Sequence, residues 1–171
     1  MNDEAFAGFK ARFEAEGTDP AAVTRLLVEG MLMLEQDAEL GSQMMALVYS
    51  KKNLELAPDA PAGVRFRRTD DSIRRLLANV NIARSYCGGT YQNGYGEFAP
   101  SRIELDTGYS AGRQGIDYPA PGQAKYFVKS GGADTPRPVA LARNNAGYWK
   151  VTNFSSLTVG VRQPATEAGD F

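Results

Sequence analysis

Apolar side chains recur at helical spacing through the first third of the chain. The first group is Phe6, Phe9 and Phe13. At this spacing the three rings share one face of a helix, and Gly17 can end that helix. Asp19 followed by Pro20 is typical of a helix start, with an N-capping side chain and then proline at the first helical position. The apolar positions that continue the helical period after Pro20 are Val23, Leu26, Leu27, Met31 and Leu34. The pattern therefore predicts two consecutive helices.

Two further helices are predicted by an aspartate followed by an apolar stripe. Asp37 can cap the first of them, and its stripe is Leu40, Met44, Leu47 and Val48. Asp70 or Asp71 can cap the second, and its apolar side is Ile73, Leu76, Leu77 and Val80. Residues 50–69 lie between these helices and contain proline and glycine with weak periodicity, so we expect a connecting loop there.

After position 86 the pattern changes to short β-rich runs separated by turn residues. Of the 18 glycines, 13 lie beyond this position. The runs cover residues 103–107, 124–130, 138–143, 148–152 and 157–162. The sequence 144–147, Asn-Asn-Ala-Gly, predicts a hairpin turn because asparagine and glycine tolerate positive φ. In the fourth run, alternation places Trp149 and Val151 on one face, so we expect Trp149 to be largely buried.

The order of the elements, helices first and strands second, predicts an α+β fold. We expect N-terminal helices packed on a C-terminal antiparallel β-sheet rather than alternating βαβ units. The 171 residues suit one domain. We assign residues 1–162 to this single α+β domain and residues 163–171 to a flexible tail.

The composition excludes several familiar kinds of chemistry. The chain has no histidine and one cysteine. Ser-His-Asp and Cys-His catalysis, zinc sites of the Cys/His type and an internal disulfide are therefore impossible within one chain. Only carboxylate-type metal sites remain open, and we expect neither a metal centre nor a cofactor.

The formal net charge is −1 but is unevenly distributed. Residues 1–64 hold 5 basic and 11 acidic side chains, whereas residues 65–171 hold 14 and 9. We interpret this as a helical part that packs beside a basic part of the same chain. The overall balance argues against broad nucleic-acid binding, which needs an excess of lysine and arginine.

Nothing in the sequence indicates a membrane protein. No apolar stretch approaches the length of a membrane span, and the first residues lack the basic start and apolar run of a signal peptide. We therefore expect no membrane partner and a cytoplasmic location.

Two short motifs resemble known functional signatures without their required context. Residues 108–112 match the G-x-S-x-G nucleophile elbow, but that elbow needs a histidine base. Residues 94–99 fit the loosest dinucleotide fingerprint, but Pro100 and a predicted strand follow where a helix is needed. Both are better interpreted as glycine-rich loops.

The segment 84–96 concentrates aromatic, amide and hydroxyl groups in a predicted loop. Its tyrosines could stack on a sugar ring or pack against a peptide, and its arginine could pair with a carboxylate or phosphate. The candidate ligand-binding residues are Arg84, Tyr86, Tyr91, Asn93 and Tyr95. The structural alternative is a tightly wound loop whose tyrosines cover the sheet edge.

Three longer strings suggest a family. They are NIARSYCGGTYQNGY, YFVKSGGADTPRPVAL and GYWKVTNFSSLTVGVR. Together they resemble segments of an uncharacterised bacterial domain family of unknown function, whose members also carry a helical N-terminal region similar to residues 18–40. The resemblance implies a defined domain over nearly the whole chain, and it carries no catalytic or ligand-binding residue.

The favoured function is a non-catalytic binding or accessory module that uses the Gly/Tyr/Asn-rich loop 84–96. Its partner would be an unknown protein or a small polar ligand. One alternative is a hydrolase-type enzyme that uses carboxylates, with Glu97, Glu104, Asp106 and Asp117 as candidates, or Cys87 as nucleophile. We expect Cys87 to be a buried and inert thiol, since free cysteine is among the most often buried residue types. A structural subunit is the other alternative.

Overall fold

Three helices build the N-terminal part of the protein. The computed structural model describes residues 2–106 and 120–165. The three helices are α1 (Asp3–Glu16), α2 (Pro20–Met33) and α3 (Ala38–Val48). The predicted caps are confirmed, because the side chains of Asp19 and Asp37 accept hydrogen bonds from the backbone N–H groups of Ala21 and Leu40, in the first turns of α2 and α3. Gly17 ends α1 as predicted, and its N–H donates to the carbonyl of Phe13.

Two shorter helices follow, α4 (Asp71–Ala78) and α5 (Asn81–Ser85). Of the two predicted capping residues, Asp70 and Asp71, it is Asp70 that is the N-cap of α4. Of the four residues on the predicted apolar side, Ile73 and Leu76 are buried, whereas Leu77 and Val80 are 51% and 37% exposed. The reason is geometric: successive residues point about 100° apart around a helix, and Val80 lies beyond the end of α4.

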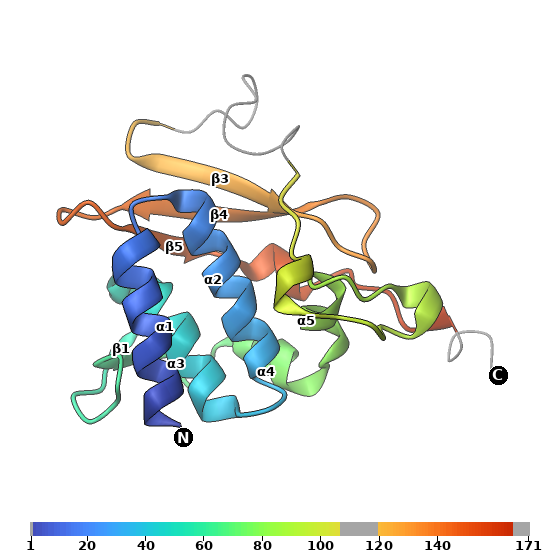
Figure 1. Cartoon of the computed structure of the whole chain (residues 1–171), viewed down its shortest axis with the longest axis horizontal. Helices are drawn as coiled ribbons and strands as arrows, with labels where there is room; N and C mark the ends of the chain where they lie inside the picture. The colour runs from blue at the N-terminus through green and yellow to red at the C-terminus, as the bar shows by residue number, and fades with distance from the viewer. Residues whose placement is uncertain (1, 107–119, 166–171) are drawn as a thin grey trace.

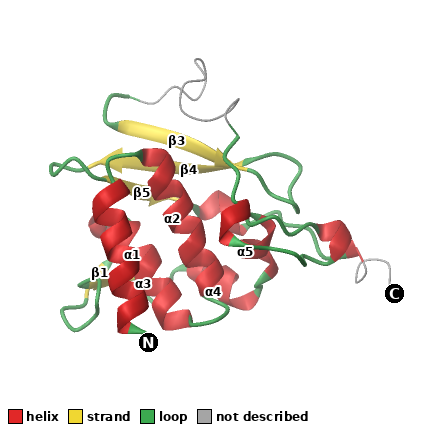
Figure 2. Cartoon of the chain, viewed as in Figure 1, coloured by secondary structure: helices red, strands yellow, loops and turns green. Residues whose placement is uncertain are grey.

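The C-terminal part contains a three-stranded antiparallel sheet. Its strands are β3 (Gln123–Val128), β4 (Arg137–Arg143) and β5 (Trp149–Asn153), in the order β3-β4-β5. The predicted hairpin turn between β4 and β5 is confirmed. The side-chain oxygen of Asn144 accepts from the N–H groups of Ala146 and Tyr148, and Gly147 has a φ of 89°. The predicted α+β class is therefore confirmed (Figure 2).

The segment predicted as a loop holds more structure than expected. Residues 50–69 contain the 3-10 helix η1 (Lys51–Asn53) and a two-stranded antiparallel pair, β1 (Glu55–Leu56) with β2 (Val64–Arg65). Strands of two residues are too short to leave a β pattern in the sequence. Gln43 of α3 anchors this pair, because its amide accepts from Ala62 N–H and donates to the carbonyl of Val64.

Two predicted strands are absent from the described residues. In place of a strand over 157–162 the chain forms the 3-10 helix η4 (Ser155–Thr158). Asn153 causes this change, because its side-chain oxygen accepts from both the N–H and the hydroxyl of Ser155 and so turns the chain out of β5. Within 103–106 only Leu105 makes a β-bridge, to Val128. Thr107 lies outside the described residues, as do residues 166–171 of the predicted tail.

One hydrophobic core joins the helices to the sheet. Figure 1 shows the sheet along one side of the molecule with the helices beneath it. Val139, Leu141 and Val151 of the sheet are buried in the same cluster as Leu27 of α2 and Met45 of α3. None of the helices in the described ranges is long and apolar enough to cross a membrane.

Strand β5 lies at the edge of the sheet and is attached on its outer side to the ends of two helices. The N–H of Trp149 donates to the carbonyl of Gly17 at 2.8 Å, and the N–H of Ser50 donates to the carbonyl of Val151 at 2.8 Å. Val151 is fully buried, whereas Trp149 is only half-buried, so its predicted burial is too high. The edge position agrees with this difference, since β5 is the last strand of the described sheet. The guanidinium of Arg143 lies 5.8 Å from the centre of the indole ring. This attachment brings the residues after α3 beside the middle of β5.

Candidate functional site

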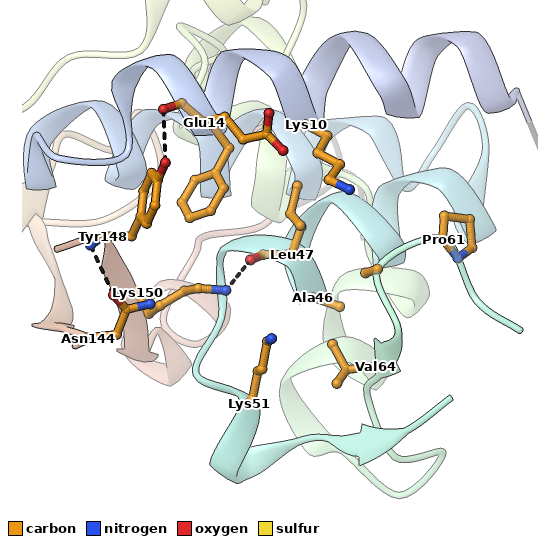
Figure 3. Close-up of a pocket in the computed structure, with 12 residues that line it drawn as sticks. Lys10, Glu14, Ala46, Leu47, Lys51, Pro61, Val64, Asn144, Tyr148 and Lys150 are labelled. Carbon is orange, nitrogen blue, oxygen red and sulfur yellow. Dashed lines mark hydrogen bonds between the residues drawn. The ribbon is translucent and has the colours of Figure 1, made fainter. Parts of the chain in front are cut away.

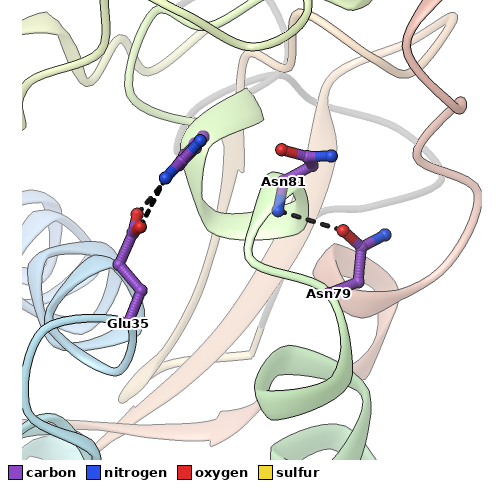
Figure 4. Close-up of polar contacts among 4 residues, drawn as sticks. Glu35, Asn79 and Asn81 are labelled. Carbon is purple, nitrogen blue, oxygen red and sulfur yellow. Dashed lines mark hydrogen bonds and ion pairs between the residues drawn. The ribbon is translucent and has the colours of Figure 1, made fainter. Parts of the chain in front are cut away.

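Arg84, the first of the predicted ligand-binding residues, belongs to α5 and is paired within the chain. Its guanidinium donates to both carboxylate oxygens of Glu35, at 3.0 and 2.6 Å (Figure 4). It also lies 4.4 Å from the ring centre of Phe98. The bidentate pair raises the pKa of Arg84. Beside it, Asn79 accepts from the N–H of Asn81 and so starts α5. The guanidinium that was predicted to pair with a ligand is thus already paired with Glu35.

Two of the predicted tyrosines lie inside the protein. Tyr86 is 1% exposed, and its hydroxyl donates to the carbonyl of Leu157 at 2.7 Å. Tyr95 is fully buried, and its hydroxyl donates to the carbonyl of Arg162. Burial raises the pKa of both phenols. These rings fix the segment to the chain that follows β5.

The remaining two predicted residues lie at the surface of the same segment. Asn93 and Thr90 form a capping box around the 3-10 helix η2 (Tyr91–Asn93). The ring of Tyr91 is half-buried and lies 4.9 Å from the guanidinium carbon of Arg162. A cleft of about 410 Å³ adjoins the segment. Four residues of the segment, Ser85, Gly88, Gly89 and Thr90, line it together with six residues from other parts of the chain. None of the five predicted ligand-binding residues is among them.

Among the described catalytic candidates, Glu104 lines the cleft beside the segment 84–96, whereas Cys87 lies in the core. The predicted burial of Cys87 is confirmed, since its side chain is fully inaccessible. Burial, and then the charges of Glu29 and Glu35, raise the pKa of its thiol to about 12. Glu104 pairs with Lys129 at 3.0 Å. Asp117 and the G-x-S-x-G match at 108–112 lie outside the described residues.

The described part of the chain offers no cluster of metal ligands. Within residues 2–106 and 120–165, no group of three or more histidine, cysteine, aspartate or glutamate side chains could hold a metal ion.

A different site lies where α1, the end of α3 and β5 meet. Two adjoining clefts of about 380 and 440 Å³ share Lys51, Asn144 and Lys150 in their walls. We call them together the lysine cleft, defined by its cationic residues Lys10, Lys51, Lys52, Arg143 and Lys150. Glu14 is the one carboxylate among the described residues that line it. Figure 3 shows the side chains of Lys51 and Lys150 extending into the first of the two clefts.

Lys150 is the most enclosed of these cations. Its ammonium donates to the carbonyl of Leu47, in the last turn of α3, at 2.6 Å and lies 5.2 Å from the ring centre of Phe13. Lysine near a helix C-terminus satisfies a carbonyl that has no partner within the helix. Burial, followed by repulsion from Lys51, lowers the pKa of Lys150 to about 8. The fold thus holds this cation partly away from water and close to a second one.

The lowered pKa of Lys150 predicts how the stability of the fold depends on pH. The lysine pKa is 10.5 without such shifts and about 8 in the fold, so in this window the unfolded chain holds a proton that the folded chain releases. Stability rises with pH wherever the unfolded state binds more protons. The free energy of unfolding of the wild type, minus that of Lys150→Met, is therefore expected to increase as the pH is raised through this window. Denaturant titrations at several pH values measure it.

Lys129 provides a control of opposite sign. Its hydrogen bond with Glu104 raises the pKa of Lys129, so stability from this pair is lost as the pH rises through the folded value. The free energy of unfolding of the wild type, minus that of Lys129→Met, is accordingly expected to fall as the pH is raised. If the difference in free energy of unfolding between the wild type and Lys150→Met did not change with pH, the partly buried position of Lys150 would be contradicted.

Sequence reasoning missed the lysine cleft because its residues are far apart in the chain. Lys10 comes from α1, Lys51 from η1, and Lys150 from β5. One local signal was present: Lys51 and Lys52 come three and four residues after Val48, where the predicted apolar stripe ends, and lysine is favoured near helix C-termini. That signal alone says nothing about which strand lies opposite.

Comparison with known proteins identifies the family but no relative of known activity. No curated protein and no solved structure matches the chain. The family described as a domain of unknown function, DUF6935, matches residues 4–165. This match covers all the helices and strands described above except the first residue of α1, and it agrees with the resemblance to a domain of unknown function seen in the sequence. The chain is a member of the DUF6935 family.

Proposed function

We propose that the protein is a non-catalytic binding module that holds a small anionic ligand in the lysine cleft. The observation that carries the proposal is the position of the Lys150 ammonium, half-buried and close to Lys51. Removing a cation from water is costly unless an opposite charge compensates. Glu14 is the one carboxylate lining the cleft within the described residues. An anion bound between the lysines would relieve both the desolvation and the repulsion.

The segment 84–96 supports a binding role less well. The polar groups of Arg84, Tyr86 and Tyr95 already contact other parts of the chain, and the side-chain oxygen of Asn93 accepts from Thr90 N–H within the segment. A ligand there would have to displace these contacts, and leaving a buried polar group unpaired costs about 1–3 kcal/mol. The lysine cleft needs no such rearrangement, so it is the better candidate for the same class of function.

The shape of the lysine cleft favours a small molecule with carboxylate or phosphate groups. Clefts of about 380 and 440 Å³ lie in the size range of small-molecule sites. The apolar wall formed by Phe13, Ala46 and Val64 can contact the uncharged part of such a ligand. Cations from three separate elements can contact an anion from several sides.

Binding of pyrophosphate and of citrate, measured by isothermal titration calorimetry at low salt, tests the proposal. We expect saturable binding of at least one of them that weakens as salt is added, because salt screens exposed charges. Lys51→Ala is expected to weaken binding about tenfold, which corresponds to about 1.4 kcal/mol for one charged contact.

Arg74→Gln is the matched control, because it removes one positive charge from the exposed side of α4, where Arg74 faces Asp71. It should leave the affinity within about twofold, since a distant exposed charge acts only through screened interactions. Equal losses for both variants would contradict a localised site. Loss of binding in Tyr91→Ala but not in Lys51→Ala would instead place the site at the segment 84–96. Binding of an acidic peptide, with neither small anion bound, would overturn the small-molecule assignment.

A further inference from the structure

We propose that Lys150 is a reactive amine that captures a carbonyl-containing anion, an aldehyde or keto acid, as a reversible imine in the lysine cleft. This inference rests on the proposed function, since it names the chemical class of the anion. It goes further in assigning covalent chemistry to one side chain.

The geometry presents the amine of Lys150 to a ligand. Lys150 lines both halves of the lysine cleft, so a molecule in either half can reach it. Its hydrogen bond to the carbonyl of Leu47 fixes the nitrogen at 2.6 Å from that oxygen. The amine lies 5.2 Å from the ring centre of Phe13, and Figure 3 shows Lys51 within the same cleft. The amine is thus held in place rather than extended into water.

The surroundings of Lys150 favour the neutral amine that this chemistry requires. A lysine becomes nucleophilic when it is desolvated or placed beside another cation. Both conditions hold here, because burial and Lys51 lower the pKa of Lys150 to about 8. A substantial fraction of the side chain is therefore neutral in mildly alkaline solution.

The proposed reaction is balanced without an oxidant or a metal. The amine nitrogen attacks the carbonyl carbon and forms a C–N bond, and the adduct then loses the carbonyl oxygen as water, with both nitrogen protons, to give the imine. Both protons leave in the water molecule, so the overall step needs no further acid or base. Glu14 and Tyr148 line the same cleft, and the hydroxyl of Tyr148 donates to the backbone carbonyl of Glu14. Lys51 and Arg143 can pair with the anionic end of the ligand.

Reductive trapping tests the inference on the intact chain. The protein is incubated at pH 8 with succinic semialdehyde, an aldehyde that carries a carboxylate, and with cyanoborohydride, whose hydride reduces any imine to a stable secondary amine. Peptide mass mapping then gives the rate at each lysine. We expect Lys150 to be alkylated about tenfold faster than Lys129, because a larger neutral fraction outweighs the lower basicity of its nitrogen. Added pyrophosphate should slow labelling of Lys150 but not of Lys129.

Two controls separate the ligand class from the reactivity. Butanal is the uncharged counterpart of the semialdehyde and should label Lys150 more slowly, since it lacks the carboxylate that the other cations hold. Lys150→Arg keeps the positive charge and should remove the fast labelling while leaving the slow labelling elsewhere. Equal labelling of Lys150 and Lys129 would overturn the inference.

The outcomes also separate this inference from the proposed function. Calorimetric binding of pyrophosphate without preferential labelling of Lys150 would refute imine formation and leave the anion site standing. Fast labelling of Lys150 that is equal for both aldehydes, with no binding of pyrophosphate or citrate, would refute the anion site, and with it the anionic class of ligand named here.

Discussion

Tyr86→Ala is expected to lower the free energy of unfolding by about 3–5 kcal/mol, the range for removing a large buried aromatic side chain. The side chain is 1% exposed, and its hydroxyl donates to the carbonyl of Leu157. Truncation would therefore leave a cavity and an unpaired carbonyl between α5 and η4. Urea denaturation of the purified variant measures the loss.

Tyr86→Phe separates the two parts of this effect. It keeps the ring and removes only the hydroxyl, so the expected loss is about 1–3 kcal/mol from the unpaired carbonyl of Leu157. Tyr91→Ala, which truncates a half-buried ring of the same segment, should cost less than Tyr86→Ala. A loss below about 1 kcal/mol for Tyr86→Ala would show that Tyr86 is not a core residue.

Gly131→Ala is expected to destabilise the fold by about 3 kcal/mol, the upper end of the usual cost of overpacking. A Cβ atom at Gly131 would lie 2.0 Å from the carbonyl oxygen of Gly89 and 2.8 Å from the Cα of Thr90. Both are backbone atoms, so no side chain can move away to make room. The N–H of Gly131 also donates to the carbonyl of Ser85 at 2.7 Å, which fixes its position. Thermal and urea denaturation both report this change.

Gly8→Ala is the matched control for Gly131→Ala. Gly8 lies within α1, and a Cβ added there meets nothing within 4 Å. Alanine in an exposed helical position is favoured over glycine by about 1 kcal/mol, so this variant should be more stable than the wild type. Destabilisation by both substitutions to the same extent would contradict the close approach at Gly131.

The helical part of the fold could be predicted because its signals are local. Asp19, Asp37 and Asp70 each cap a helix through their own side chain, and the apolar stripes after them need only the helical period. The hairpin turn at 144–147 is also local, since one asparagine side chain and one glycine define it. These features depend on residues within about one turn of each other.

The sheet was harder to predict because burial does not distinguish a strand from other buried segments. Leu157 and Thr158 are as buried as strand residues, yet they lie in a 3-10 helix that the side chain of Asn153 initiates. The pair β1–β2 depends on Gln43 of α3, which is distant in sequence. The apolar composition of a run was therefore not enough to assign it.

The composition of the segment 84–96 suggested a binding role, but composition does not distinguish contacts with a ligand from contacts within the chain. Tyrosine, arginine and asparagine suit ligand recognition, but the same side chains also suit contacts within the chain. Here Tyr86 and Tyr95 reach backbone carbonyls, and Arg84 reaches Glu35. The lysine cleft left no comparable signal because Lys51 and Lys150 meet only after β5 docks beside the end of α3.

The attachment of β5 to the ends of α1 and α3 has a consequence for how the protein can associate with others. An unpaired outer strand can recruit a strand from another chain, either as a peptide ligand or in aggregation. On β5 the N–H of Trp149 is already taken by Gly17, and the carbonyl of Val151 by Ser50. An incoming strand would have to displace both contacts. Recruitment by strand addition is therefore disfavoured along this edge.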